Sequence, residues 1–171
     1  MGYYITAHGT ITMPRSLEAQ ALQALKMLNY DHDAKRGGEF GAGASKDPFD
    51  SKWYSWMPTR WHETVTNVEE VLDMVGFGTV KQRQAGLNVY TVTYDNKTGQ
   101  EDVFLNCLAG YAQVEIEVVG EDGERWKWAN AKAGSPLLHL NANVTYSPYA
   151  TVTDLIAKER EYDKKARMMY A

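Results

Sequence analysis

The sequence is poor in the features that mark several large classes of protein. It has a single cysteine, Cys107, which excludes a disulfide framework and a cysteine-based zinc site. No apolar run approaches the roughly 18 residues that cross a bilayer. The opening MGYYITAHGTITM lacks the basic flank and apolar block of a signal peptide. We therefore expect a soluble, intracellular protein that does not associate with membranes.

Positive charge is also in short supply. The 171 residues include 18 Lys and Arg against 22 Asp and Glu, which gives a net charge of −4. Proteins that bind nucleic acid mainly through electrostatic attraction carry an excess of basic residues. Nucleic acid is therefore an unfavourable partner for this chain. The length is sufficient for one domain with a substantial hydrophobic core.

Hydrophobic periodicity predicts a mixture of strands and helices. Apolar residues alternate with polar ones at the start of the chain, so Ile5 and Ile11 face the same side, and Pro14 ends this strand. The strongest hairpin has a three-residue turn, Glu121-Asp122-Gly123, because this turn pairs Val118 with Trp126. The other predicted helices span about 16–29, 60–75, 99–109 and 152–169. Ser16 is expected to cap the first of these, and the second begins at Arg60 or at a Thr66–Glu69 capping box. The other predicted strands are 78–84, 88–95 and 137–146.

The order of these elements indicates the fold class. Without the first helix, it is strand, helix, strand, strand, helix, strand, which is the split βαβ pattern. We predict an α+β, ferredoxin-like antiparallel sheet with helices on one face and an extra C-terminal strand and helix. Right-handed crossovers place the first strand between strands 88–95 and 112–119. The predicted single domain, 1–171, comprises a core (strand 2–13 plus 60–130), an insertion (14–59, with a helix and an aromatic loop) and a C-terminal strand–helix extension (137–171).

The run LAGYAQVEIEVVGEDGERWKW at residues 108–128 resembles a pattern in small proteins of phages, plasmids and prophages. In those proteins a helix leads into a strand and then into a GEDGE-x-W-x-W hairpin, and some are assigned ferredoxin-like folds. The similarity covers about residues 66–130 and the opening GYY. It implies a mobile-element protein that acts in a bacterial cytoplasm, and it implies no particular chemistry. The aromatic loop, the last strand and the C-terminal helix depart from the pattern.

The densest group of aromatic residues lies in the stretch WYSWMPTRW. Trp53, Tyr54, Trp56 and Trp61 together with Arg60 form the side-chain mixture that is enriched at binding hot spots. The alternative is that these rings attach the long loop 31–58 to the core. We predict these five residues as a protein-binding site, and we expect Trp61 to be more buried than Trp53 or Trp56.

Two further groups contain residues capable of catalysis or metal binding. His8 with Glu115 or Glu117 forms a possible acid–base pair on the polar sheet face, but no nucleophile or oxyanion-hole motif accompanies it. Ordinary cross-strand pairing is therefore the preferred interpretation. Asp31, His32 and Asp33, with His62 and Glu63 as further ligands, are candidates for a metal site. They lack the spacing of known metal motifs, so we favour a solvated turn and predict no metal and no cofactor.

These observations favour a binding function over catalysis. The leading hypothesis is a mobile-element accessory protein that binds a host or phage macromolecule, most simply a protein, and modulates or inhibits a bacterial defence or housekeeping complex. The alternative is an enzyme or binder that acts on nucleotides or nucleic acid through the polar sheet face. A third hypothesis is a homo-oligomer formed through the C-terminal helix, whose apolar residues are Leu155, Tyr162, Ala166 and Met169.

Overall fold

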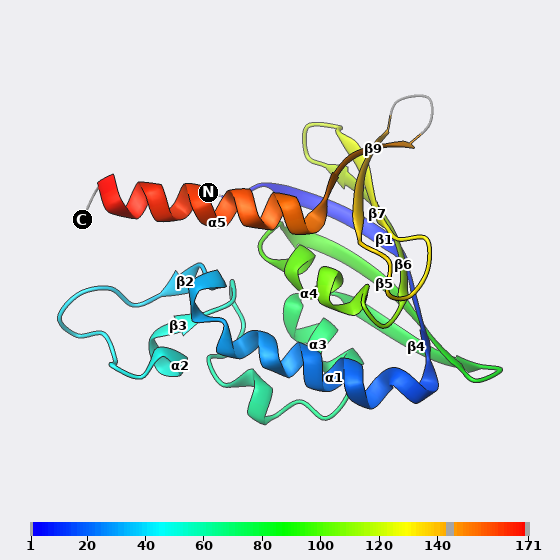
Figure 1. Cartoon of the computed structure of the whole chain (residues 1–171), viewed down its shortest axis with the longest axis horizontal. Coiled ribbons are helices and arrows are strands. Elements are labelled where there is room, and N and C mark those ends of the chain that lie inside the picture. The colour runs from blue at the N-terminus through cyan, green and yellow to red at the C-terminus, as the bar shows by residue number, and fades with distance from the viewer. Residues whose placement is uncertain (1, 143–145, 170–171) are drawn as a thin grey trace.

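A sheet of seven strands forms the centre of the protein in the computed structural model, which describes residues 2–142 and 146–169 (Figure 1). The strand order is β4-β5-β1-β6-β7-β8-β9. Each neighbouring pair in it is antiparallel. The strands are β1 (Tyr4–Pro14), β4 (Gly78–Gln84), β5 (Leu87–Lys97), β6 (Gln113–Gly120), β7 (Arg125–Ala129), β8 (Leu138–Ala142) and β9 (Tyr146–Thr151).

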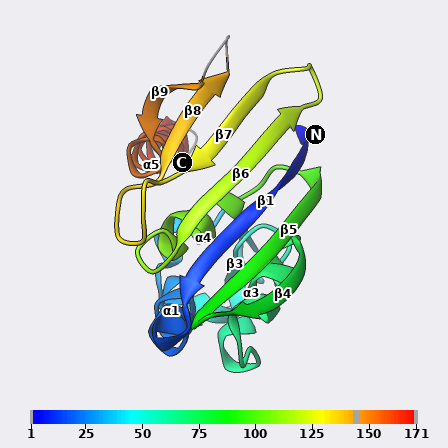
Figure 2. The same cartoon turned by 90° about the vertical axis from the view of Figure 1, so that its right-hand side faces the viewer.

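The helices gather on one face of this sheet. They are α1 (Glu18–Met27), α2 (Pro48–Ser51), α3 (Val68–Val75), α4 (Glu101–Leu108) and α5 (Val152–Met169). In Figure 2 the strands lie in front and these helices lie behind them, so the other face of the sheet is uncovered. The predicted α+β class is confirmed.

The alternation of β1 decides which face becomes the core. Ile5 and Ile11 are buried beneath the helices, whereas Thr6 and Thr10 are exposed on the uncovered face. β1 pairs with β5 and with β6, which are the two neighbours predicted for it. β1 also approaches β6 closely at Gly9, where an added Cβ would lie 2.0 Å from a carbonyl oxygen of β6.

The hairpin between β6 and β7 has the predicted register. Val118 lies opposite Trp126, and Glu117 lies opposite Lys127. The turn depends on Gly123, whose φ of +85° is in the left-handed region that favours glycine. The Gly123 amide donates a 3.0 Å hydrogen bond to the Gly120 carbonyl. Pairing of apolar side chains across the strands therefore identified the turn type correctly.

Two predicted helix starts differ from the structure. Ser16 does not cap the first helix, because residues 15–17 form a 3₁₀ turn and α1 begins at Glu18 without a side-chain cap. The α3 cap is displaced by one residue from the predicted box. The Asn67 side chain accepts a hydrogen bond from the Glu70 amide at 2.9 Å, and the Glu70 carboxylate accepts one from the Thr66 amide at 2.8 Å.

The prediction of one strand over 137–146 followed by a linker is wrong. β8 ends at Ala142, residues 143–145 lie outside the described residues, and β9 takes the place of the linker. Pro148 of β9 lies opposite Leu140. Proline lacks an amide donor but is tolerated in an edge strand, where one side of the backbone has no neighbour.

The C-terminal helix runs along the helical side of the sheet. α5 follows β9 directly, packs against α4 and extends past the insertion (Figure 1). The insertion carries its own small sheet, β2 (Gly37–Gly38) paired with β3 (Lys52–Trp53). Across residues 2–142 and 146–169, no helix has the length and apolar character needed to cross a membrane.

Candidate binding cleft

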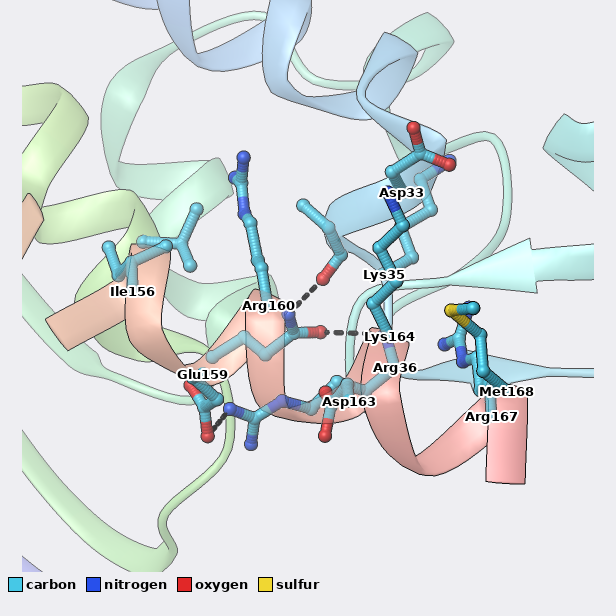
Figure 3. A pocket seen from close by; sticks show the side chains of 13 residues that line it. Asp33, Lys35, Arg36, Ile156, Glu159, Arg160, Asp163, Lys164, Arg167 and Met168 are labelled. Carbon is cyan, nitrogen blue, oxygen red and sulfur yellow. Dashed lines mark hydrogen bonds and ion pairs between the residues drawn. The ribbon is translucent and has the colours of Figure 1, made fainter. Parts of the chain in front are cut away.

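A cleft of about 400 Å³ separates α5 from the insertion, and Figure 3 shows it from close by. One wall is the segment 33–36, and the other is the side of α5 that runs from Ile156 to Met168. Gln100 and Val103, at the start of α4, complete the lining. This volume is within the usual range of ligand pockets.

Gln100 holds the insertion wall in place. It is buried, and its side-chain amide donates a 2.6 Å hydrogen bond to the Ala34 carbonyl. Its side-chain oxygen accepts hydrogen bonds at 3.3 Å from the amides of Arg36 and Ser55. One glutamine thus joins three separate parts of the chain, and this bonding fixes the backbone that forms the wall.

Two ion pairs attach α5 to the other side of the cleft. Arg36 pairs with Glu159, as Figure 3 shows, and Arg160 pairs with Asp31 at 3.0 Å. The side chains in both pairs are between 38% and 46% exposed. Solvent screens pairs at this exposure, so each stabilises the docked helix only modestly.

The far end of the cleft combines positive charge with apolar surface. Lys164 and Arg167 line it together with Asp163, and neither cation has a carboxylate oxygen within 4 Å of its side-chain nitrogens among the described residues. Val103, Ile156 and Met168 provide the apolar part of the lining. This combination suits a ligand that carries a carboxylate or another anion beside an apolar group.

Lys35 is part of the wall, but its ammonium group is turned into the insertion. It is 2% exposed, and its Nζ lies 3.1 Å from His32 Nδ1 and 5.3 Å from the centroid of the Phe49 ring. Burial, together with the nearby positive charge of Lys52, lowers the pKa of Lys35 to about 8. Contact of a cation with an aromatic ring stabilises this arrangement. Lys35 therefore supports the insertion from within.

A second cavity, of about 520 Å³, lies beside the first half of α5. Its lining includes Leu28, Ile156 and Cys107, the thiol whose pKa burial raises to about 11. Thr153 Oγ1 donates a 3.3 Å hydrogen bond to Asn106 at this place. This cavity shares Val103, Ile156 and Arg160 with the cleft, so the two lie next to each other along the side of α5 that faces the body of the protein.

The structure divides the predicted aromatic site between core and surface. Tyr54 and Trp61 have no exposed surface, and the Tyr54 hydroxyl donates a 2.9 Å hydrogen bond to the Leu28 carbonyl. Trp53 is half-buried against Gly37, whereas Trp56 is 46% exposed. The segment therefore attaches the insertion to the core, and Trp56 is its most exposed ring.

Arg60, the first residue after the insertion, is occupied by carboxylates of its own chain. Its guanidinium donates to Asp47 at 2.6 Å, to Asp50 at 2.9 Å and to Glu63 at 2.9 Å. These hydrogen bonds raise the pKa of Arg60. Because these three carboxylates already occupy its donors, Arg60 offers little to an external partner.

The candidate metal ligands do not converge. Asp31 pairs with Arg160, and His32 is directed at Lys35. His62 Nδ1 lies 2.6 Å from the Asn29 amide nitrogen. Within the part of the chain that the structure describes, no group of three or more His, Cys, Asp or Glu side chains is placed to hold a metal ion.

The candidate acid–base pair lies on the uncovered sheet face. His8 Nε2 is 3.5 Å from a Glu117 carboxylate oxygen, and the two side chains are 68% and 48% exposed. Glu115 instead pairs with Lys127 at 2.6 Å. The structure brings His8 and Glu117 together in an open, water-accessible position.

Apart from Asp33, which was a candidate metal ligand, the residues of the cleft were not among those predicted from the sequence. They come from segments more than 100 positions apart, and the charges of α5 alternate in sign, as in an ordinary solvated helix. The available signal was the count of cations near the end of that helix. Comparisons of the chain with protein-family models, curated proteins and solved structures gave no match.

Proposed function

We propose that this protein is a non-catalytic accessory protein that binds another protein through the cleft beside α5. The observation that carries the proposal is the pairing of Lys164 and Arg167 with an apolar lining in one cavity. A segment of a partner protein that bears a carboxylate next to an apolar side chain matches both features. Charge complementarity gives such an interface its specificity and its rate of association.

The arrangement of the titratable groups supports binding in preference to catalysis. His8 and Glu117 form an exposed pair, and the Asp31, His32 and Asp33 side chains are directed at separate partners or at solvent. Catalytic sites instead place a nucleophile or base within reach of an orienting group and of an oxyanion donor. The candidate residues in the described part of the chain do not form this arrangement, which fits a protein that acts by occupying a surface of its partner.

The biological setting that we propose follows from the resemblance of residues 108–128. It is a mobile element in a bacterial cytoplasm, where the protein modulates a defence or housekeeping complex. The strand order β4-β5-β1-β6 supports a ferredoxin-like assignment for the core, because that order with antiparallel neighbours is the one expected for the split βαβ pattern.

The proposal is tested by reversing charge in the cleft. K164D/R167D should lose a protein that the tagged wild-type chain captures in stoichiometric amount. R83D/R125D, which makes the same change of charge on exposed residues elsewhere, should retain it. The captured protein is then purified and its affinity measured at two salt concentrations, with weaker binding expected at the higher one. If both variants retain the same proteins as the wild type, the cleft is not the binding site.

A second candidate function is supported by the uncovered sheet face. The contact between His8 and Glu117 favours an enzyme or binder that acts on nucleotides or nucleic acid there. A thermal-shift panel of nucleotides and divalent ions tests it, since a ligand that binds the folded state raises the melting temperature. A melting temperature that no member of the panel changes would eliminate this candidate.

A further inference from the structure

The cleft and the second cavity form one groove along α5, which we call the α5 groove. Its two parts share Val103 of α4 and Ile156 and Arg160 of α5. On α5 the groove extends from Thr153 to Met168, a length of about 22 Å at about 1.5 Å per residue. A ligand that fills the whole groove must therefore be long and narrow.

The end of the groove near the start of α5 is largely apolar. Five of the eight residues that line it have apolar or thiol side chains, namely Leu28, Val103, Cys107, Ile156 and Ala157. Of these, Leu28, Cys107 and Ile156 are each partly exposed to solvent. A ligand that covers them removes apolar surface from water, which stabilises the bound state. This end, the apolar end, therefore suits a hydrocarbon chain.

The opposite end of the groove has a net positive charge. Five cations and three carboxylates line the cleft, namely Lys35, Arg36, Arg160, Lys164 and Arg167 with Asp33, Glu159 and Asp163. Arg36 and Arg160 are held in ion pairs, and the Lys35 ammonium group is turned into the insertion. Lys164 and Arg167 are therefore the cations that a bound anion would meet.

We propose that the α5 groove binds a single-chain anionic amphiphile, which is a long hydrocarbon chain that ends in a carboxylate. The carboxylate accepts hydrogen bonds from Lys164 and Arg167, and the chain passes Val103 and Ile156 and ends beside Cys107. Hydrogen bonds between charged groups are stronger than those between neutral groups. A peptide that filled the same length would leave backbone amides and carbonyls without partners at the apolar end, which is unfavourable. A hydrocarbon chain carries no such groups, so the polarity of the groove favours the amphiphile.

The ion pair between Arg160 and Asp31 lies where the two parts of the groove meet, and the proposed chain leaves it in place. Val103 and Ile156 give the two parts an apolar surface in common, so the chain displaces no charged side chain. The inference does not rest on the existence of a protein partner. The carboxylate nevertheless uses the two cations that we assign to the partner protein, so the amphiphile and the partner should compete for the cleft.

The experiment is isothermal titration calorimetry of the full chain with dodecanoate, below the concentration at which this ligand forms micelles. Ala157 is exposed and lines the apolar end, so A157W should fill that end, leave the fold intact and weaken binding by about tenfold or more. K158W places the same ring on the adjacent exposed residue, which lines neither part of the groove, and should bind dodecanoate as the wild type does. Circular dichroism and the melting temperature check that both variants are folded.

Charge and chain length are tested separately. K164D/R167D should weaken the binding of dodecanoate by about tenfold or more, whereas R83D/R125D should leave it unchanged. Decanoate should bind the wild type about tenfold more weakly than dodecanoate, because it buries two fewer methylene groups. Dodecyltrimethylammonium carries the opposite charge on the same chain and should bind more weakly than dodecanoate.

Three outcomes would overturn the proposal. They are a wild-type chain that does not bind dodecanoate, equal affinities for A157W and K158W, and binding of dodecyltrimethylammonium as tight as that of dodecanoate. A157W does not alter a residue that lines the cleft, so it should still capture the partner protein. Failure of this inference is thereby distinguished from failure of the proposed function.

Discussion

Removal of the ion pairs that hold α5 should expose the thiol beneath it. The variant D31N/E159Q deletes the carboxylate of each pair without altering a residue that lines the cavity beside Cys107. We expect Cys107 to react faster with a maleimide in this variant than in the wild type, and the folded state to remain intact. The sequence contains one cysteine, so the measured rate reports on one position.

The size of the effect follows from the exposure of the two pairs. Their side chains are between 38% and 46% exposed, and pairs of this kind contribute up to about 1 kcal/mol each and commonly about half of that. Loss of both ion pairs lowers the free energy of docking of α5 by about 1 kcal/mol. This corresponds to an increase of about fivefold in the fraction of molecules with α5 undocked, and therefore in the labelling rate of Cys107. Burial raises the pKa of the thiol to about 11, so the closed state is poorly reactive near neutral pH.

The assay follows labelling by intact mass at fixed pH, with two controls. D33N/E161Q removes the same charge from carboxylates that do not pair α5 with the body, and it should label at the wild-type rate. About 1 M salt shortens the screening length to about 3 Å and should raise the wild-type rate toward that of D31N/E159Q. Equal rates for D31N/E159Q and the wild type would refute the view that these pairs hold the helix down.

Three further predictions concern stability, each measured by urea denaturation. Gly9→Ala forces a Cβ against the backbone of β6 and should lower the free energy of unfolding by about 3 kcal/mol, whereas Gly43→Ala, with nothing within 4 Å, should change it by less than about 0.5 kcal/mol. Trp61→Ala should lower the free energy of unfolding by about 4 kcal/mol and Trp56→Ala by about 1 kcal/mol; equal losses would contradict the division of the aromatic segment between core and surface. Lys81 Nζ donates a 2.8 Å hydrogen bond to the Glu18 carboxylate and lowers the pKa of that carboxyl. The stabilisation that ionised Glu18 gives the folded state is therefore present above the ordinary glutamate pKa and is lost as the pH falls toward the folded-state pKa. Glu18→Gln should make stability less dependent on pH in that range, and an unchanged pH profile would count against the contact.

The parts of the fold that were predictable are those with local periodicity. Alternation in β1 identified the buried face, and the requirement that Val118 meet Trp126 identified the turn between β6 and β7. β9 was missed because Ser147-Pro148 is typical of a linker. The backbone of an edge strand tolerates proline, and the sequence alone does not show which strand will lie at an edge.

The candidate site was less predictable, because distant residues build it. Arg60 pairs with two carboxylates of the insertion and with Glu63, and Gln100 connects Ala34 with Ser55 through hydrogen bonds that have no spacing signal. Aromatic density correctly singled out an unusual segment. It could not distinguish a ring such as Tyr54, which fills the core, from one such as Trp56, which is partly exposed.

The position of β1 has a consequence for the way the chain folds during synthesis. β1 leaves the ribosome before the other six strands of its sheet, but its neighbours are β5 and β6, so its second edge has no hydrogen-bonding partner until about residue 120 has emerged. Contacts between such distant residues slow folding, and an unpaired apolar strand is prone to aggregate in the meantime. β1 is therefore the strand most dependent on slow translation, low temperature or a chaperone for a good yield of folded protein.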